Sequence, residues 1–134
     1  MIDLPAEWLL AASDDIDAAE KLLSEKHLTH IVSFHCQQAV EKTFKAVLEK
    51  YGEKVEKTHN LEKLFTKVNK YLSIAIDETI LLKINEIYID SRYPADFGLL
   101  PDGKPPLQQA EEFVAFAKYI KGQISSLINS RDTI

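Results

Sequence analysis

The hydrophobic residues in the first half of the chain recur at alternating steps of three and four, which is the period of an amphipathic helix. The first such stripe consists of Leu9, Ala12, Ile16, Ala19 and Leu23. The second runs between Thr29 and Gly52 and consists of Val32, Cys36, Ala39, Val40, Thr43 and Val47. Two long helices are therefore predicted, with Pro5 in the first turn of one and Gly52 at the C-terminal end of the other.

Three more helices are predicted beyond the charged loop that follows Gly52. A short helix that begins near residues 58–60 carries Leu61, Leu64, Phe65 and Val68, and another that begins near Asp77 carries Ile80, Ile84, Ile87 and Tyr88. Residues 92–106 contain four of the five prolines and predict a loop, after which a long helix opens at the Pro105–Pro106 pair. No stretch alternates with a period of two for long enough to predict a strand. We predict an all-α fold, an antiparallel up-and-down bundle of about five helices, three long and two shorter.

The composition fits one globular domain spanning residues 1–134, because 46% of the residues are hydrophobic and 28% are charged. Cys36 is the single cysteine of the sequence, and a chain that cannot form an internal disulfide is typical of a reducing compartment. The N-terminus has no basic region ahead of its apolar residues, and no apolar run approaches the roughly 18 residues that a membrane span needs. We expect a soluble, cytoplasmic protein.

The net charge of −5 argues against a general nucleic-acid coat protein, but the charges are unevenly distributed. Residues 41–70 contain eight lysines and five glutamates and so carry a net charge of +3. We interpret this basic region as a solvated helix face with ion pairs such as Glu41–Lys45.

Three short segments occur in an order that is typical of one protein family. Residues 34–52, FHCQQAVEKTFKAVLEKYG, resemble the second helix of HEPN domains. Within them, QQAVEKTFKA is close to the usual sequence of the family in this helix. Residues 58–64, THNLEKL, resemble the histidine-and-leucine start of the next helix of the family. Residues 88–94, YIDSRYP, resemble its helix-ending Arg-Tyr-Pro. Because the segments have this order and spacing, the resemblance extends over roughly residues 7–128.

The resemblance implies an all-helical and commonly dimeric protein. Many proteins of this kind are encoded beside a minimal nucleotidyltransferase and act with it as a toxin–antitoxin pair. The catalytic branch of the family cleaves RNA with an arginine that is followed, after four to six residues, by a histidine. In such a motif the histidine moves a proton near neutral pH, and the arginine stabilises the charge that develops on the phosphate.

Arg92 is the position at which this chain departs from that motif. Four to six intervening residues lead to Phe97, Gly98 or Leu99, none of which is a histidine. All four histidines of the sequence precede both arginines, Arg92 and Arg131. We therefore assign no catalytic residue and expect a protein that is not an RNase of the family type.

Two uses remain open for Arg92 and for the polar face of the second helix. In the functional interpretation, these residues contact a phosphate-bearing ligand, because arginine suits bidentate phosphate binding. The candidate nucleotide- or RNA-binding residues are Arg92, Tyr93, Lys42, Lys45, Gln38 and His59. In the structural interpretation, Arg92 complements the helix dipole before Pro94 stops the helix, and the polar face is solvated or faces a second subunit. His59 then belongs to a helix start that Thr58 or Asn60 caps.

The remaining histidines do not predict a metal site or a cofactor. The stretch HLTHIVSFHC lacks the paired ligand spacing of structural zinc sites, and adjacent His35 and Cys36 point about 100° apart on a helix. Glu56 and His59 form the one Glu-x-x-His match, but they lie in a predicted loop, where a di-iron bundle would need them on a helix. Cys36 lies on the apolar stripe and is predicted to be a core residue.

We expect a HEPN-like binding or interaction module that forms a homodimer and works with a minimal nucleotidyltransferase, a partner that the resemblance alone implies. The homodimer is also predicted from apolar residues that lie off the main stripes, namely Trp8, Phe34, Leu48 and Tyr51. Two alternatives stay open. One is an RNA-cleaving toxin with a non-standard site, and the other is a free-standing nucleotide-binding domain.

Overall fold

The computed structural model describes residues 2–92 and 104–132, and every regular element in these parts is a helix. The prediction of an all-α bundle with three long and two shorter helices is confirmed. The elements are α1 (Leu4–Leu22), the 3-10 turn η1 (Lys26–Leu28), α2 (Thr29–Lys50), α3 (Leu61–Val68), α4 (Glu78–Arg92) and α5 (Leu107–Asp132). None of the described helices is long and apolar enough to cross a membrane.

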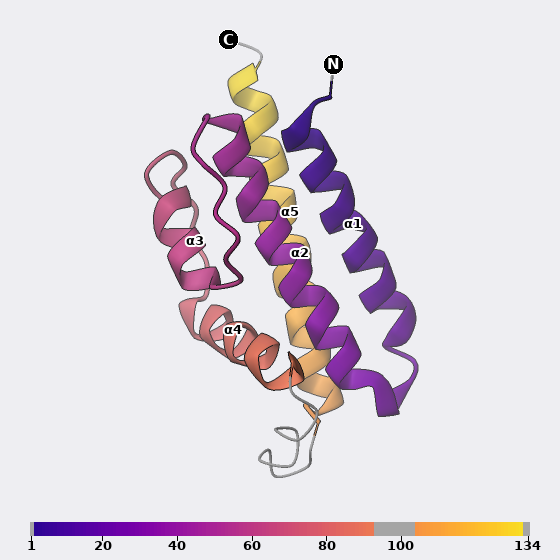
Figure 1. The fold of residues 1–134 in the computed structure, drawn as a ribbon. Coiled ribbons are helices and arrows are strands. Elements are labelled where there is room, and N and C mark those ends of the chain that lie inside the picture. Colours follow the sequence, from indigo (N-terminus) through magenta and orange to yellow (C-terminus); the bar gives the residue numbers. More distant parts are fainter. Residues whose placement is uncertain (1, 93–103, 133–134) are drawn as a thin grey trace.

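Helix α2 lies at the centre of the bundle and contacts all four other α-helices. Figure 1 shows α1 on one side of α2, α5 behind it, and α3 and α4 on the other side. The start of α1 and the end of α5 lie at the same end of the bundle, and α1 is antiparallel to both α2 and α5 (Figure 1). Helices α2 and α5 run in the same direction, and the segment between α2 and α3 returns alongside α2.

The helix ends follow from local hydrogen bonds that the sequence specifies. Asp3 accepts a hydrogen bond from the Ala6 amide at 3.1 Å and caps α1, and Asn60 caps α3 in the same way. Gly52 has a φ of 71°, and its amide and that of Glu53 donate to the Glu49 and Leu48 carbonyls at 3.2 and 2.9 Å. This is a Schellman motif, which ends α2 at the glycine that the sequence indicates.

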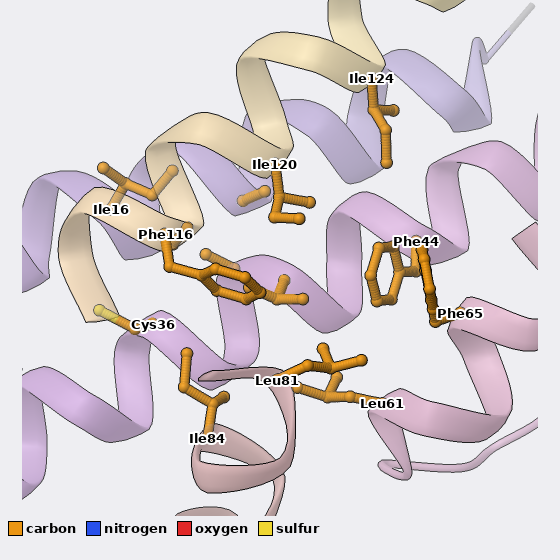
Figure 2. Close-up of a cluster of buried hydrophobic side chains, with 14 of the residues drawn as sticks. Ile16, Cys36, Phe44, Leu61, Phe65, Leu81, Ile84, Phe116, Ile120 and Ile124 are labelled. Atoms are coloured by element: carbon orange, nitrogen blue, oxygen red, sulfur yellow. The ribbon is translucent and has the colours of Figure 1, made fainter. Parts of the chain in front are cut away.

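The core is formed where the apolar stripes of the helices meet along α2. Ala12, Ile16 and Ala19 of α1 are buried, as is the whole predicted stripe of α2. Figure 2 shows Phe116, Ile120 and Ile124 of α5 reaching into the same cluster as side chains of α2, α3 and α4. The stripes read from the sequence are therefore the core-facing sides of the helices.

Two apolar residues that the sequence analysis placed on a dimer surface pack within this single chain instead. Leu48 is fully buried within the core of the bundle, where α2 packs against four other helices. Tyr51 stacks on Tyr71 with ring centroids 4.8 Å apart. The placement of Leu48 on an exposed face was wrong, since a central helix is covered on nearly every side.

Candidate functional site

A narrow row of partly exposed polar side chains runs along the middle of α2. His35, Gln38 and Lys42 are spaced three and four residues apart and are partly exposed, and we call them the α2 polar strip. Two buried carboxylates flank the strip, Asp15 from α1 and Glu41 from α2 itself. The strip is the part of the candidate site that the structure describes most fully.

Asp15 holds two of the three strip residues. Its Oδ1 lies 2.9 Å from Nδ1 of His35, and its Oδ2 accepts a hydrogen bond from Nζ of Lys42 at 2.7 Å. When Nδ1 of the neutral imidazole donates to the carboxylate, Nε2 is the unprotonated ring nitrogen that can accept a proton. This arrangement joins α1 to α2, and it also fixes the orientation of a partly exposed histidine.

Glu41 is the centre of a second polar cluster. Its carboxylate lies 2.8 Å from Nζ of Lys45 and 2.9 Å from Nδ1 of His59, and it accepts a hydrogen bond from Nε2 of Gln37 at 3.2 Å. Gln37 in turn accepts a hydrogen bond from Gln38, which connects this cluster to the strip. Glu41 therefore ties α2 to the segment that precedes α3.

The Glu41–Lys45 pair forms as predicted, but the prediction that the pair is solvated was wrong. The side chains of Glu41 and Lys45 are only 5% and 7% exposed. Nζ of Lys45 also lies 5.6 Å from the ring centroid of Trp8 in α1, within the range of a cation–π contact. The pair is buried because α1 and the returning segment cover this side of α2.

The candidate ligand residues therefore differ in how well they could reach a ligand. Gln38 and Lys42 lie on the partly exposed strip, and His59 is 46% exposed at the other side of Glu41. Lys45 is enclosed by Glu41 and Trp8, so it is poorly placed to contact a ligand directly. The Arg92 side chain and Tyr93 lie outside the described residues.

Helix α4 is a neighbour of this site, as a contact between Arg92 and the strip would require. Helices α2 and α4 pack against each other, and the amide of Leu61 donates a hydrogen bond to Oδ1 of Asn85 in α4 at 2.9 Å. This bond fixes α4 against the start of α3, next to His59. The backbone arrangement thus brings α4 to the side of α2 that carries the Glu41 cluster.

The charges of the two clusters nearly balance. Asp15 offsets Lys42, and Glu41 offsets Lys45, so the two lysines contribute little net positive charge unless the histidines are protonated. An anionic ligand must therefore compete with internal carboxylates. Such a site suits weak binding that depends on salt concentration.

In the described residues, Cys36 and the histidines are not arranged as a metal site, and Cys36 is not an activated thiol. No group of three or more histidine, cysteine or acidic side chains in residues 2–92 and 104–132 is arranged to hold a metal ion. Burial, and then the charge of Asp15, raise the pKa of the Cys36 thiol to about 12, so it stays protonated at neutral pH. The pKa of His30 is lowered by burial and by the nearby Lys104 and His27.

Sequence reasoning missed Asp15 and did not foresee that Glu41 is buried and organises a cluster. Asp15 could have been found from the sequence, since it lies between Ala12 and Ile16 on the buried side of the first apolar stripe. A buried acid at such a position requires a partner. Glu41 had only its helical spacing to Gln37 and Lys45, which does not distinguish a buried cluster from a solvated one. The structure supplies the missing contacts from α1 and from His59.

The likeness to known proteins extends over nearly the whole chain. A model of the HEPN domain matches residues 6–124. The fold is similar to the crystal structure of TT1696 from Thermus thermophilus, with a TM-score of 0.79 and 22% identity over 93% of this chain and 98% of that one. It is also similar to ST0689, an archaeal HEPN homologue, with a TM-score of 0.71 and 21% identity over 92% and 97%. A search of curated proteins found no match.

Proposed function

Since the chain belongs to the HEPN domain family, we propose that it is a binding module for a phosphate-bearing ligand, either a nucleotide or an RNA backbone. It acts without the Arg-x4–6-His chemistry of the family RNases, as a cytoplasmic homodimer that works with a minimal nucleotidyltransferase. The sequence supports the absence of the RNase chemistry, because positions 97–99 contain no histidine. The partner and the toxin–antitoxin role rest on the family resemblance.

The observation that carries the ligand proposal is the α2 polar strip. Lys42 offers an ammonium and Gln38 an amide to the solvent side of the bundle, and Asp15 holds Lys42 in place from below. A phosphate oxygen bound here would accept hydrogen bonds from both side chains. His59 would border the ligand on the side of Glu41, and Arg92 at the end of α4 and the following residue, Tyr93, are the remaining candidate contacts.

Binding of nucleotides and RNA tests this proposal directly. We would titrate labelled ATP and a short single-stranded RNA with wild type, Lys42→Ala, Arg92→Ala and the control Lys21→Ala, an exposed lysine on α1. Weaker binding by the first two variants, with the control unchanged and stronger salt dependence for wild type, supports the site. Equal binding by all four proteins removes Lys42 and Arg92 from any ligand site. A lower thermal stability of Arg92→Ala with unchanged binding assigns Arg92 to the helix end.

A second function, RNA cleavage at a non-standard site, is favoured by one observation. His35 is held through Nδ1 by Asp15 and lies one helical turn from Gln38, so it has the arrangement of an oriented general base. We expect no cleavage of single-stranded RNA by the purified protein in a metal-free assay. Cleavage that is lost in His35→Ala or Arg92→Ala, with the fold intact, would replace the binding proposal with this one.

The homodimer can be checked without any ligand. Light scattering at tens of micromolar protein should give the mass of two chains. A clean monomer mass would contradict this part of the proposal and leave the ligand site untouched, because the strip is formed by one chain.

A further inference from the structure

A groove between the start of α4 and the middle of α5 lies apart from the α2 polar strip. It has a volume of about 480 Å³ and is lined by Ile76, Ile80, Phe116 and Tyr119, by two alanines, and by two carboxylates. Pockets of this size hold small ligands or single large side chains. The OH of Tyr119 donates a hydrogen bond to the carbonyl of Ala75 at 2.8 Å, which fixes the segment before α4 against α5.

The charge of the groove has one sign. Asp77 and Glu112 are its two charged lining residues, and the described residues that line it include no lysine, arginine or histidine. Asp77 lies at the start of α4, where it complements the helix dipole and accepts hydrogen bonds from the amides of Thr79 and Ile80, whereas Glu112 lies beyond the first turn of α5. That role accounts for the position of Asp77 but not for that of the exposed Glu112, and the lining between the two acids is apolar.

A neighbouring groove on the other side of α4 repeats this combination. It lies between α3 and α4 and is lined by Phe65, Leu81 and Leu82 together with the carboxylates of Glu62 and Glu78. Leu82 is 44% exposed, and Tyr119 beside the first groove is 45% exposed. The surface around the first turns of α4 thus combines the exposed apolar side chains of Leu82 and Tyr119 with four carboxylates.

We propose that this acidic-rimmed groove is a docking site for a basic peptide segment of a partner protein. One large apolar side chain of that segment would enter between Ile80 and Phe116, and lysine or arginine residues on either side of it would pair with Asp77 and Glu112. A buried apolar anchor contributes much of the affinity of an interface, and complementary charges around it contribute specificity and speed of association. A lysine-rich segment also suits a chain whose own net charge is −5.

The same charges argue against a second copy of this chain as the occupant. In a two-fold interface each surface patch meets itself, so the carboxylates of one groove would face those of the other. Like charges in such positions are repulsive, and the groove offers no cation to relieve them. A basic partner meets no such repulsion.

Selection from a phage-displayed library of random dodecapeptides tests the proposal with the intact protein. We expect the enriched peptides to contain an aromatic or large aliphatic residue flanked by lysine or arginine. Synthetic peptides of that sequence should bind the wild type less tightly as salt is raised. No enrichment, or enrichment of acidic or neutral sequences, would overturn the proposal.

Variants locate the binding. Glu112→Lys should weaken binding of the selected peptides by about tenfold or more, because a rim attraction becomes a repulsion. Glu111→Lys is the matched control, since it changes the net charge equally at the neighbouring exposed position, which does not line the groove. It should change binding by less than about twofold.

Ala115→Phe tests the apolar part of the groove without a change in charge. Ala115 is an exposed lining residue, so a phenyl group there occupies the groove and should abolish binding while the melting temperature stays near that of wild type. Unchanged binding in Ala115→Phe and in Glu112→Lys would place the peptides elsewhere and refute the proposal. A protein that forms dimers as wild type and monomers as Ala115→Phe would show that the groove binds a second copy, which also refutes it. Neither result bears on ligand binding at Lys42.

Discussion

Removal of the charge of Glu41 should destabilise the fold far more than removal of a similar charge on the surface. Glu41 is buried and interacts with Lys45, His59 and Gln37. In Glu41→Gln the ammonium of Lys45 stays buried, at 7% exposure, without a counter-charge. His59 is 46% exposed, so water can replace its lost partner, and the cost falls mainly on Lys45.

The magnitude follows from the burial of the pair. Loss of one partner of a buried ion pair typically costs about 3–5 kcal/mol, because the remaining charge is left desolvated. The total stability of a domain is about 5–15 kcal/mol, so a loss of this size is about a fifth of it or more. The cation–π contact between Lys45 and Trp8 is present in the wild type and can persist in the variant, so it does not reduce the difference between them. We expect a decrease of about 3–5 kcal/mol.

Glu20→Gln is the matched control. Glu20 pairs with Lys118 at 3.1 Å between α1 and α5, but these side chains are 42% and 54% exposed. An exposed pair of this kind contributes about 0–1 kcal/mol. Urea titrations of wild type and both variants, followed by circular dichroism and extrapolated linearly, give the two free energies of unfolding for comparison.

The double variant Glu41→Leu/Lys45→Met separates charge burial from packing. It replaces both charged side chains with apolar ones of similar size, so the unpaired charge disappears and most of the lost stability should return. Equal small losses for Glu41→Gln and Glu20→Gln would show that Lys45 escapes to solvent, and the buried cluster would then be refuted. A double variant less stable than Glu41→Gln would show that packing, and not charge, explains the loss.

Three further predictions concern the thiol, an exposed ion pair and the glycines. The Cys36 thiol, with a pKa of about 12, should react with Ellman's reagent far more slowly at pH 8 in the native protein than in urea, and rapid native labelling would contradict its burial. Hydrogen bonds from Lys67, and then from a second lysine of α3, lower the pKa of Glu56 from 4.5 to about 2. Its stabilising effect is thus present above pH 4.5 and lost towards pH 2, and the stability difference between wild type and Glu56→Gln should shrink over that range, whereas a constant difference would exclude this linkage. Gly52→Ala should cost about 1 kcal/mol because φ is 71°, whereas Gly122→Ala inside α5 should be stabilising, and equal effects in thermal melts would argue against the Schellman end of α2.

The helices and their ends could be predicted from the sequence because their causes are local. The spacing of Ala12, Ile16 and Ala19 specifies which side of α1 is buried, whatever that side packs against. Gly52 tolerates a positive φ, so it ends α2 with bonds to residues three to five positions earlier. The resemblance to HEPN domains likewise depends on short segments in order, and it correctly indicated the family.

The site depended on contacts between residues far apart in the sequence. His35 and Lys42 meet Asp15 across 20 and 27 positions, and Glu41 meets His59 across 18. Helical periodicity places a side chain on a face but does not say which helix covers that face. The sequence pattern therefore does not distinguish a lysine that is exposed to solvent from one that forms a buried ion pair.

The sequence by itself determined that this chain forms five amphipathic helices, where they begin and end, and that they belong to a HEPN-type bundle. The tertiary structure decided that α2 lies at the centre and that Lys45 is enclosed while Lys42 stays partly exposed. The physical reason is that burial belongs to the whole assembly of helices. Glu41 and Lys45 lose their water because α1 and the segment before α3 cover them. Trp8 and His59, from these two parts of the chain, then interact with the buried charges.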